Sequence, residues 1–206
     1  MKCFDIGANI GETTQWFLDN GYDNVIAVEP GADAFSQLFQ KFSNDPRIIM
    51  HYLALSKQSG PLEFWNSNWH ITSTASKSWV LNSRFSGKCA WNAITKNAVT
   101  LDELIELHGL PDFLKVDVEG YELEVFKGLT YSGIKNIAFE WAEEEYTQLN
   151  EIINYLKGFR YLEFSFTYAD NLSDSKNLTY KEWDKLDIHL DIIPSRKEKW
   201  GMIYAR

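Results

Sequence analysis

The residues nearest the N-terminus combine glycines and acids in a spacing that suits a nucleoside ligand. Asp5, Gly7, Asn9 and Gly11 lie within CFDIGANIGET, residues 3–13, where an apolar run meets a glycine-bearing turn. Gly7 and Gly11 are placed for a tight turn and for close packing of a following helix. The dinucleotide fingerprint has a second glycine two residues after the first, and this chain has Asn9 there. No lysine follows the glycines as in a P-loop, so a phosphate ligand is disfavoured.

A further acid, Glu29, ends the next apolar run, roughly 20 residues beyond the glycine turn. In a doubly wound sheet, an acid at this place accepts hydrogen bonds from the hydroxyls of a ribose. Asp5 and Glu12 flank the turn with negative charge, which repels phosphate and attracts a cation. S-adenosylmethionine is an adenosine ligand with positive charge and no phosphate. The pattern therefore favours S-adenosylmethionine over NAD.

The second group of candidate residues lies at the end of a later apolar run. Lys115, Asp117 and Glu119 alternate along LKVDVEG, so on a straight strand their side chains share one face. A charged face on a central strand is costly unless it opens into a site. Glu140 ends the following apolar run and could approach the same cleft. The alternative is a Lys115–Asp117 ion pair at the rim of the sheet, with Glu119 and Glu122 as ordinary acids in the first turn of a helix.

Short apolar runs alternate with longer amphipathic ones, and this pattern predicts the elements that position both groups. We expect strands at 2–6, 24–30, 47–55, 112–118, 135–141, 160–168 and 200–206, and helices at 12–21, 32–42, 100–110, 121–129 and 143–158. This order predicts a doubly wound, mainly parallel α/β sheet covered on both faces. The last two strands have no helix between them, which predicts an antiparallel C-terminal edge.

Residues 60–98 interrupt the alternation. They contain Trp65, Trp69, Trp79 and Trp91 among serine, asparagine and threonine. Local positive charge comes from Lys77, Arg84, Lys88 and Lys96. Ligands of parallel α/β sheets bind beyond the carboxyl ends of the strands, and this insert follows such an end. It is a candidate lid or substrate wall. The alternative is a surface excursion whose tryptophans pack on the sheet.

The composition limits the class of protein. The chain has 206 residues, 45% of them hydrophobic, which predicts one folded domain over 1–206. Its formal charge is -9, so a nucleic-acid partner is not expected.

Cys3 and Cys89 form neither a metal pair nor a disulfide framework, which fits a cytoplasmic protein. We find no signal peptide or membrane span, and interpret the glycosylation-like patterns at Asn171 and Asn177 as turns.

Several of these stretches, in order, resemble one family. FDIGANIGETT, VIAVEPGADAF, LALSKQSG, TLDEL and LKVDVEGYELEVFKGL, which run from residue 4 to about 140, are similar to the FkbM family of S-adenosylmethionine-dependent methyltransferases. KVDVEGYE after TLDEL is the most specific part. The resemblance implies a class I methyltransferase fold with a seven-stranded sheet whose last strand is inserted antiparallel. It also implies O-methylation of a sugar or another small hydroxylated metabolite.

The resemblance assigns roles position by position. Asp5, Gly7, Asn9 and Gly11 match the cofactor loop, and Glu29 matches the acid that binds ribose. Ala54, Leu55 and Ser56 fall where such enzymes hold the adenine, and Asp117 falls where they meet the methionine part of the cofactor or the acceptor.

A hydroxyl acceptor must lose its proton, whereas the sulfonium already supplies the leaving group. We expect Asp117 or Glu119 to act as the base or to accept a hydrogen bond from the hydroxyl, with Lys115 tuning their charge. His51 and His70 are alternatives. Asp117 and Glu140 resemble the metal ligands of catechol-type methyltransferases, but we find no clear third ligand and expect no metal.

Two other functions remain open at this point. An NAD-linked oxidoreductase could use the same Glu29, although Asn9 stands where a glycine is needed. A catalytically silent adenosine-binding fold could serve as a partner subunit, although the acids at 117, 119 and 140 argue against it.

Overall fold

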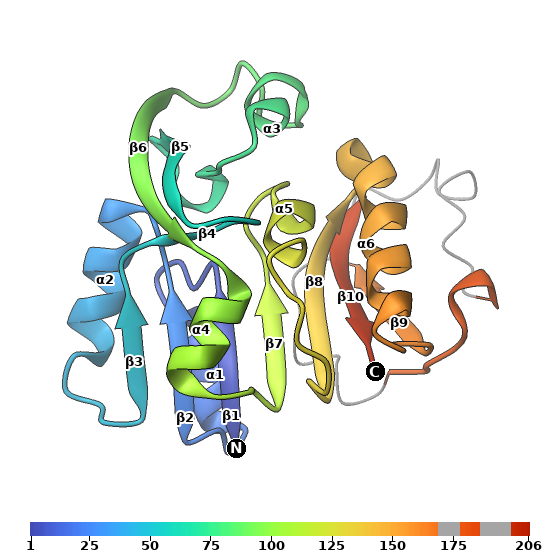
Figure 1. Ribbon diagram of the computed structural model, residues 1–206. Coiled ribbons are helices and arrows are strands. Elements are labelled where there is room, and N and C mark those ends of the chain that lie inside the picture. The colour runs from blue at the N-terminus through green and yellow to red at the C-terminus, as the bar shows by residue number, and fades with distance from the viewer. Residues whose placement is uncertain (169–177, 186–198) are drawn as a thin grey trace.

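The computed structural model describes residues 1–168, 178–185 and 199–206. The turns predicted around Asn171 and Asn177 lie outside these residues. The main sheet has seven strands in the order β3-β2-β1-β7-β8-β10-β9 (Figure 1). The strands are β1 (Lys2–Ile6), β2 (Asn24–Val28), β3 (Ile48–His51), β7 (Phe113–Val116), β8 (Asn136–Ala142), β9 (Phe164–Tyr168) and β10 (Trp200–Ala205).

The five strands from β3 to β8 pair in parallel, and β10 pairs antiparallel with both β8 and β9. The last strand is thus inserted between two earlier ones. This confirms the mainly parallel α/β sheet with antiparallel C-terminal strands that the alternating pattern and the family resemblance predicted.

Helices cover both faces of the sheet. They are α1 (Glu12–Asp19), α2 (Ala32–Phe42), α4 (Leu101–His108), α5 (Glu122–Phe126) and α6 (Tyr146–Gly158). Phe17 of α1 and Leu38 of α2 pack with Cys3 and Val25 on one face, whereas α4, α5 and α6 pack with the alternate strand residues, such as Phe4, on the other. Because side chains alternate across a strand, strands buried on both faces are almost continuously apolar. None of the described helices is long and apolar enough to cross a membrane.

Two of the differences between predicted and observed boundaries bear on the site. The strand expected at 47–55 is two strands: β3 ends at His51, and β4 (Ala54–Leu55) belongs to a second, three-stranded sheet. Apolar residues continue across the break through Tyr52 and Leu53, so hydrophobicity alone does not reveal the change of partner. The strand expected at 112–118 ends at Val116. Asp117 and Glu119 therefore lie in the turn that follows it.

The insert at 60–98 builds most of the second sheet. β5 (Gly60–Ser67) pairs antiparallel with β6 (Trp91–Val99), which pairs in parallel with β4. The short helix α3 (Lys77–Asn82) lies between β5 and β6 in sequence, and the whole unit lies beyond the carboxyl ends of the main strands (Figure 1). Trp79 is buried, whereas Trp69 is 48% exposed. The insert thus forms a small structured unit of its own at the edge where α/β sheets bind ligands.

Candidate active site

The turn from β1 to α1 depends on two glycines. Gly7 and Gly11 have φ angles of 77° and 85°, and Asn9 between them has a φ of 51°. A Cβ on Gly7 would lie 1.7 Å from the Asp117 carbonyl oxygen, and one on Gly11 would lie 2.4 Å from the Phe42 ring. The left-handed backbone and the lack of space both require glycine at these two positions. The turn is therefore held tightly between the end of β7 and helix α2.

Glu29 follows β2, and backbone donors hold its carboxylate. Its Oε2 accepts a hydrogen bond of 2.9 Å from the Asn9 N–H, and its Oε1 accepts one of 2.6 Å from the Gly31 N–H. Burial raises the pKa of Glu29 to about 7. Each carboxylate oxygen keeps a second lone pair for a ligand. The turn and the acid that sequence analysis paired are thus bonded to each other.

Lys115 joins the first group of residues to the second. Its Nζ donates to the Gly7 carbonyl at 2.9 Å and lies 3.4 Å from Asp5 Oδ1 and 3.2 Å from Asp117 Oδ2. Asp5 is fully buried and also accepts a hydrogen bond of 2.6 Å from Thr14 Oγ1. The structure therefore places Asp5 beneath the turn, where it anchors Lys115 and α1, and outside the cavity lining. The Lys115–Asp117 ion pair considered from the sequence is present.

Asp117 and Glu119 both line the cavity, although the strand that was expected to align them has ended. Glu119 has a φ of 57° and Gly120 a φ of 81°, so the chain turns sharply here. A Cβ on Gly120 would lie 2.9 Å from the Trp79 ring of the insert. Glu119 Oε2 is shielded from solvent and has no hydrogen-bond partner among the residues that the structure describes. The turn therefore presents an unsatisfied carboxylate oxygen beside the cavity.

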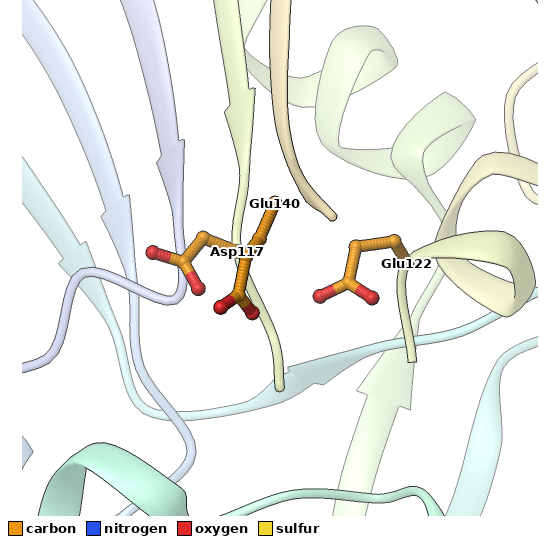
Figure 2. Close-up of side chains that lie close together, drawn as sticks. All are labelled: Asp117, Glu122 and Glu140. Carbon is orange, nitrogen blue, oxygen red and sulfur yellow. The ribbon is translucent and has the colours of Figure 1, made fainter. Parts of the chain in front are cut away.

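Two more carboxylates complete a cluster. One oxygen each of Asp117, Glu122 and Glu140 lies within 4.8 Å of the others, and the three side chains converge (Figure 2). Sequence analysis treated Glu122 as an ordinary first-turn acid, and so missed this third member. A cation could contact all three. Each already has a partner in the protein, because Asp117 pairs with Lys115, Glu122 accepts from the Val118 and Gly120 N–H groups, and Glu140 pairs with Arg84.

The burial and close spacing of these acids change their pKa values. Burial, followed by the neighbouring carboxylates, raises the pKa of Glu119 and of Glu140 well above the usual value. The pKa of Glu122 is raised to about 7, chiefly by burial. A raised pKa makes the ionised form of such a carboxyl a stronger base toward a hydroxyl in the cleft.

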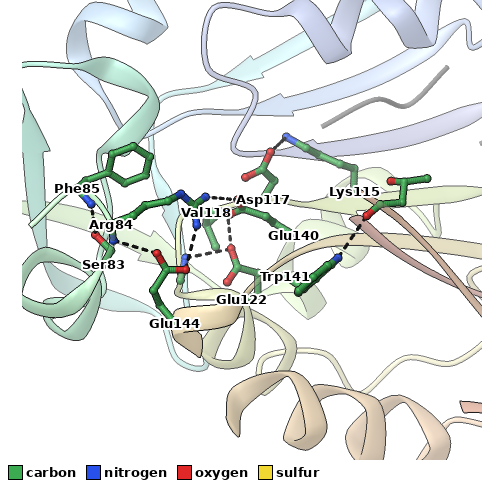
Figure 3. Close-up of polar contacts among 12 residues, drawn as sticks. Ser83, Arg84, Phe85, Lys115, Asp117, Val118, Glu122, Glu140, Trp141 and Glu144 are labelled. Carbon is green, nitrogen blue, oxygen red and sulfur yellow. Dashed lines mark hydrogen bonds and ion pairs between the residues drawn. The ribbon is translucent and has the colours of Figure 1, made fainter. Parts of the chain in front are cut away.

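Arg84 connects the insert to this cluster, and sequence analysis noted it only as local positive charge. Its guanidinium lies 3.0 Å from Glu144 Oε2 and 3.7 Å from Glu140 Oε1 (Figure 3). It also lies over the rings of Trp79, Phe85 and Trp200, at 5.2, 5.0 and 5.4 Å from their centroids. Glu140, Glu144 and Trp200 are far from Arg84 in sequence, so no local spacing could have revealed these partners.

A cavity of about 250 Å³ runs along this edge from Glu29 to Glu140. Its walls include the glycine turn, Leu53–Leu55, insert residues, the turn after β7 and Trp200. Ala54 and Leu55 line it, whereas Ser56 is buried beside them and bonds to Tyr121. His70 lines it and its Nδ1 lies 2.7 Å from Asn9 Oδ1. His51 is not among the lining residues, and its Nε2 lies 2.8 Å from His108 Nε2.

The family model of the methyltransferase FkbM domain matches residues 5–163. The chain belongs to the FkbM methyltransferase family. A curated relative, hexuronic acid methyltransferase AglP of Haloferax volcanii, is 33% identical over 130 residues, which are 62% of this chain and 49% of that protein. The match thus spans about half the length of the curated relative.

Solved structures that align with this chain include a methyltransferase and a protein bound to S-adenosyl-L-methionine. A precorrin-6y C5,15-methyltransferase from Geobacter metallireducens aligns with 100% of this chain and 79% of its own, at 10% identity and a TM-score of 0.48. The fibrillarin of Aeropyrum pernix in complex with S-adenosyl-L-methionine aligns with 100% of this chain and 66% of its own, at 11% identity and a TM-score of 0.47. The strand order of this FkbM family member is that of the class I methyltransferase fold.

Proposed function

We propose that this FkbM family member transfers a methyl group from S-adenosylmethionine to a hydroxyl of a sugar or another small metabolite. One observation carries the proposal: a continuous cavity joins Glu29, an acid suited to a ribose, to the carboxylates of Asp117 and Glu119. Cofactor and acceptor can thus meet in one enclosed space. The curated relative, a hexuronic acid methyltransferase, supports a carbohydrate acceptor.

The cavity fits the parts of the cofactor in order along the sheet edge. Glu29 would accept the ribose hydroxyls, and Ala54 and Leu55 would form the apolar wall for the adenine, with Ser56 supporting them from behind. Gly7 and Asn9 would lie against the middle of the ligand, whereas Gly11 lies outside the cavity lining and shapes the turn from behind. The acids that flank this turn do not favour a pyrophosphate, which disfavours NAD.

The bound cofactor supplies the methyl group together with a sulfonium leaving group, so the protein need only align the acceptor and remove its proton. Glu119 is the best-placed base, because it lines the cavity and its Oε2 lacks a partner among the described residues. Its raised pKa suits it to take the hydroxyl proton. Lys115 forms an ion pair with Asp117, so Asp117 would orient the acceptor.

The insert would close the cavity toward solvent. Phe64, His70 and Ile71 from this segment line the cavity, and His70 contacts Asn9 in the glycine turn. A wall that excludes water strengthens the electrostatic interactions around the reacting groups. We therefore assign the insert the role of substrate wall, and this chemistry needs no metal.

Incubation of the purified chain with S-adenosylmethionine labelled in its methyl group, across a panel of sugars and glycosides, tests the proposal. We expect label in at least one hydroxylated acceptor and S-adenosylhomocysteine as the second product. Stable binding of NAD, with no binding of S-adenosylhomocysteine, would contradict the proposal.

A further inference from the structure

The far end of the cavity gathers more carboxyl groups than cations. Asp117, Glu119 and Glu140 line it there, and among the described lining residues near them Lys115 is the one cation. Lys115 is shared, because its Nζ lies 3.4 Å from the buried Asp5 as well as 3.2 Å from Asp117. The Lys115 ammonium group therefore already contacts two carboxylates, Asp5 and Asp117. Glu119 and Glu140 are additional acids at this end of the cavity.

The guanidinium of Arg84 does not supply the missing positive charge. Arg84 lies 3.7 Å from Glu140, but it is closer to Glu144, at 3.0 Å, which lies outside the cavity lining (Figure 3). Glu122, directly behind the lining, adds a further buried carboxylate. At Glu119, burial and the neighbouring carboxylates outweigh the charges of Arg84 and Lys115, so the pKa of this carboxyl is raised. A cation placed among these carboxyls would favour their ionised forms.

We propose that this excess of carboxyl groups over cations makes the cavity selective for a cationic centre at the methyl-transfer position, so that it holds the charged methyl donor more tightly than the neutral product. This inference rests on the proposed function. Transfer of the methyl group removes the positive charge from the sulfur. The product then loses its attraction to Glu119 and its neighbours, since the Coulomb energy of a short contact in a partly buried site is substantial. Loss of charge would therefore help to release the product.

Two analogues isolate this charge. S-adenosylhomocysteine has a neutral thioether, whereas sinefungin has a carbon with an ammonium group in place of the sulfur, and the two share the adenosine and the amino acid end. We expect calorimetric titration of the purified chain to show sinefungin binding at least about tenfold more tightly, which corresponds to about 1.4 kcal/mol.

Substitutions separate charge from hydrogen bonding. Glu119→Gln keeps a carbonyl oxygen that accepts a hydrogen bond but removes the charge, so it should reduce the preference for sinefungin several-fold and leave the affinity for S-adenosylhomocysteine nearly unchanged. Glu140→Gln should act in the same direction. The matched control is Glu106→Gln, because Glu106 is exposed on α4 and lies outside the cavity lining. It should leave both affinities unchanged.

The outcomes also distinguish this inference from the proposed function. Binding of S-adenosylhomocysteine as tightly as sinefungin, or a preference that survives both Glu119→Gln and Glu140→Gln, would overturn the charge selection and leave cofactor use intact. Binding of neither analogue would overturn the proposed function and the inference together. Retained affinity for S-adenosylhomocysteine in each variant also shows that the variant is folded.

Discussion

The two ends of the cavity are built in different ways. At the end near Glu29, backbone N–H groups of Asn9 and Gly31 hold the carboxylate, and two glycines fix the turn that supplies one of them. At the end near Glu119, side chains from several segments crowd together, and one carboxylate oxygen lacks a partner among the described residues. The first end is rigid and satisfied, as a binding site requires. At the second end, closely spaced carboxyls interact unfavourably with one another, as is typical of a reacting site.

Gly7→Ala should have the largest effect, because it breaks the contact that joins the two ends. The new Cβ would meet the Asp117 carbonyl at 1.7 Å, and the backbone there cannot move aside without displacing the turn after β7. We expect a loss of about 4 kcal/mol in the free energy of unfolding, measured by urea denaturation. Gly21→Ala is the control: Gly21 also has a φ of 85°, but a Cβ there meets nothing within 4 Å. It should cost only about 1 kcal/mol, and equal losses would contradict the packing argument.

Glu119→Gln should lower turnover at the reacting end about 100-fold, the lower range for loss of a general base. Initial rates of methyl transfer measure the effect, and binding of S-adenosylhomocysteine should stay within about twofold, since that ligand is neutral at the sulfur. Glu106→Gln should keep full rate. A full rate in Glu119→Gln would assign the base to another residue.

The binding end should show a pH dependence that follows from Glu29. Its pKa of about 7 in the empty protein means that it is largely protonated at pH 6. Hydrogen bonds from ribose hydroxyls favour the ionised form, so the ligand lowers this pKa and binding releases a proton. Affinity for S-adenosylhomocysteine should therefore rise about tenfold from pH 6 to pH 8 and level off above pH 7. Titrations across this range test it, and Glu29→Gln should flatten the profile.

The charge at the reacting end should also affect the choice of acceptor. Asp117, Glu119 and Glu140 oppose a carboxylate on the sugar, so a neutral glycoside should be methylated several-fold faster than the matching glucuronide. Parallel rate measurements with the two compounds check this. The curated relative is a hexuronic acid methyltransferase. Faster transfer to the glucuronide by this chain would contradict the prediction and would indicate that Arg84 breaks its ion pairs with Glu140 and Glu144 to bind the carboxylate of the acceptor.

The smallest effect is expected from His70→Ala, which removes the 2.7 Å contact between the insert and Asn9. A hydrogen bond of this kind contributes about 1 kcal/mol, so affinity for S-adenosylhomocysteine should fall about fivefold. Calorimetry measures the change, and no change would show that the insert does not support the glycine turn.

The contrast between the two ends also explains what could be predicted from the sequence. Gly7, Asn9, Gly11 and Glu29 lie at one strand-turn-helix-strand unit, so their local spacing indicated where they meet. The alternation of apolar runs likewise predicted the sheet, which the structure confirms.

The other end is made by contacts distant in sequence. Arg84 meets Glu144 and Trp200, and no period along the chain links them. The alternation of Lys115, Asp117 and Glu119 indicated a site, but the positive φ of Glu119 sets its direction, and a strand pattern does not contain that information. Glu122 looked like an ordinary helix-terminal acid because its two backbone donors become visible only in the folded turn.

The central claim is that this cavity binds S-adenosylmethionine, and a thermal-shift titration with S-adenosylhomocysteine beside NAD tests it most directly. A ligand at a hundred times its dissociation constant adds about 2.7 kcal/mol to the stability of the folded state. The account predicts a rise in melting temperature with S-adenosylhomocysteine, no rise with NAD, and a much smaller rise for Glu29→Ala. A rise with NAD alone, or an equal rise in Glu29→Ala, would contradict it.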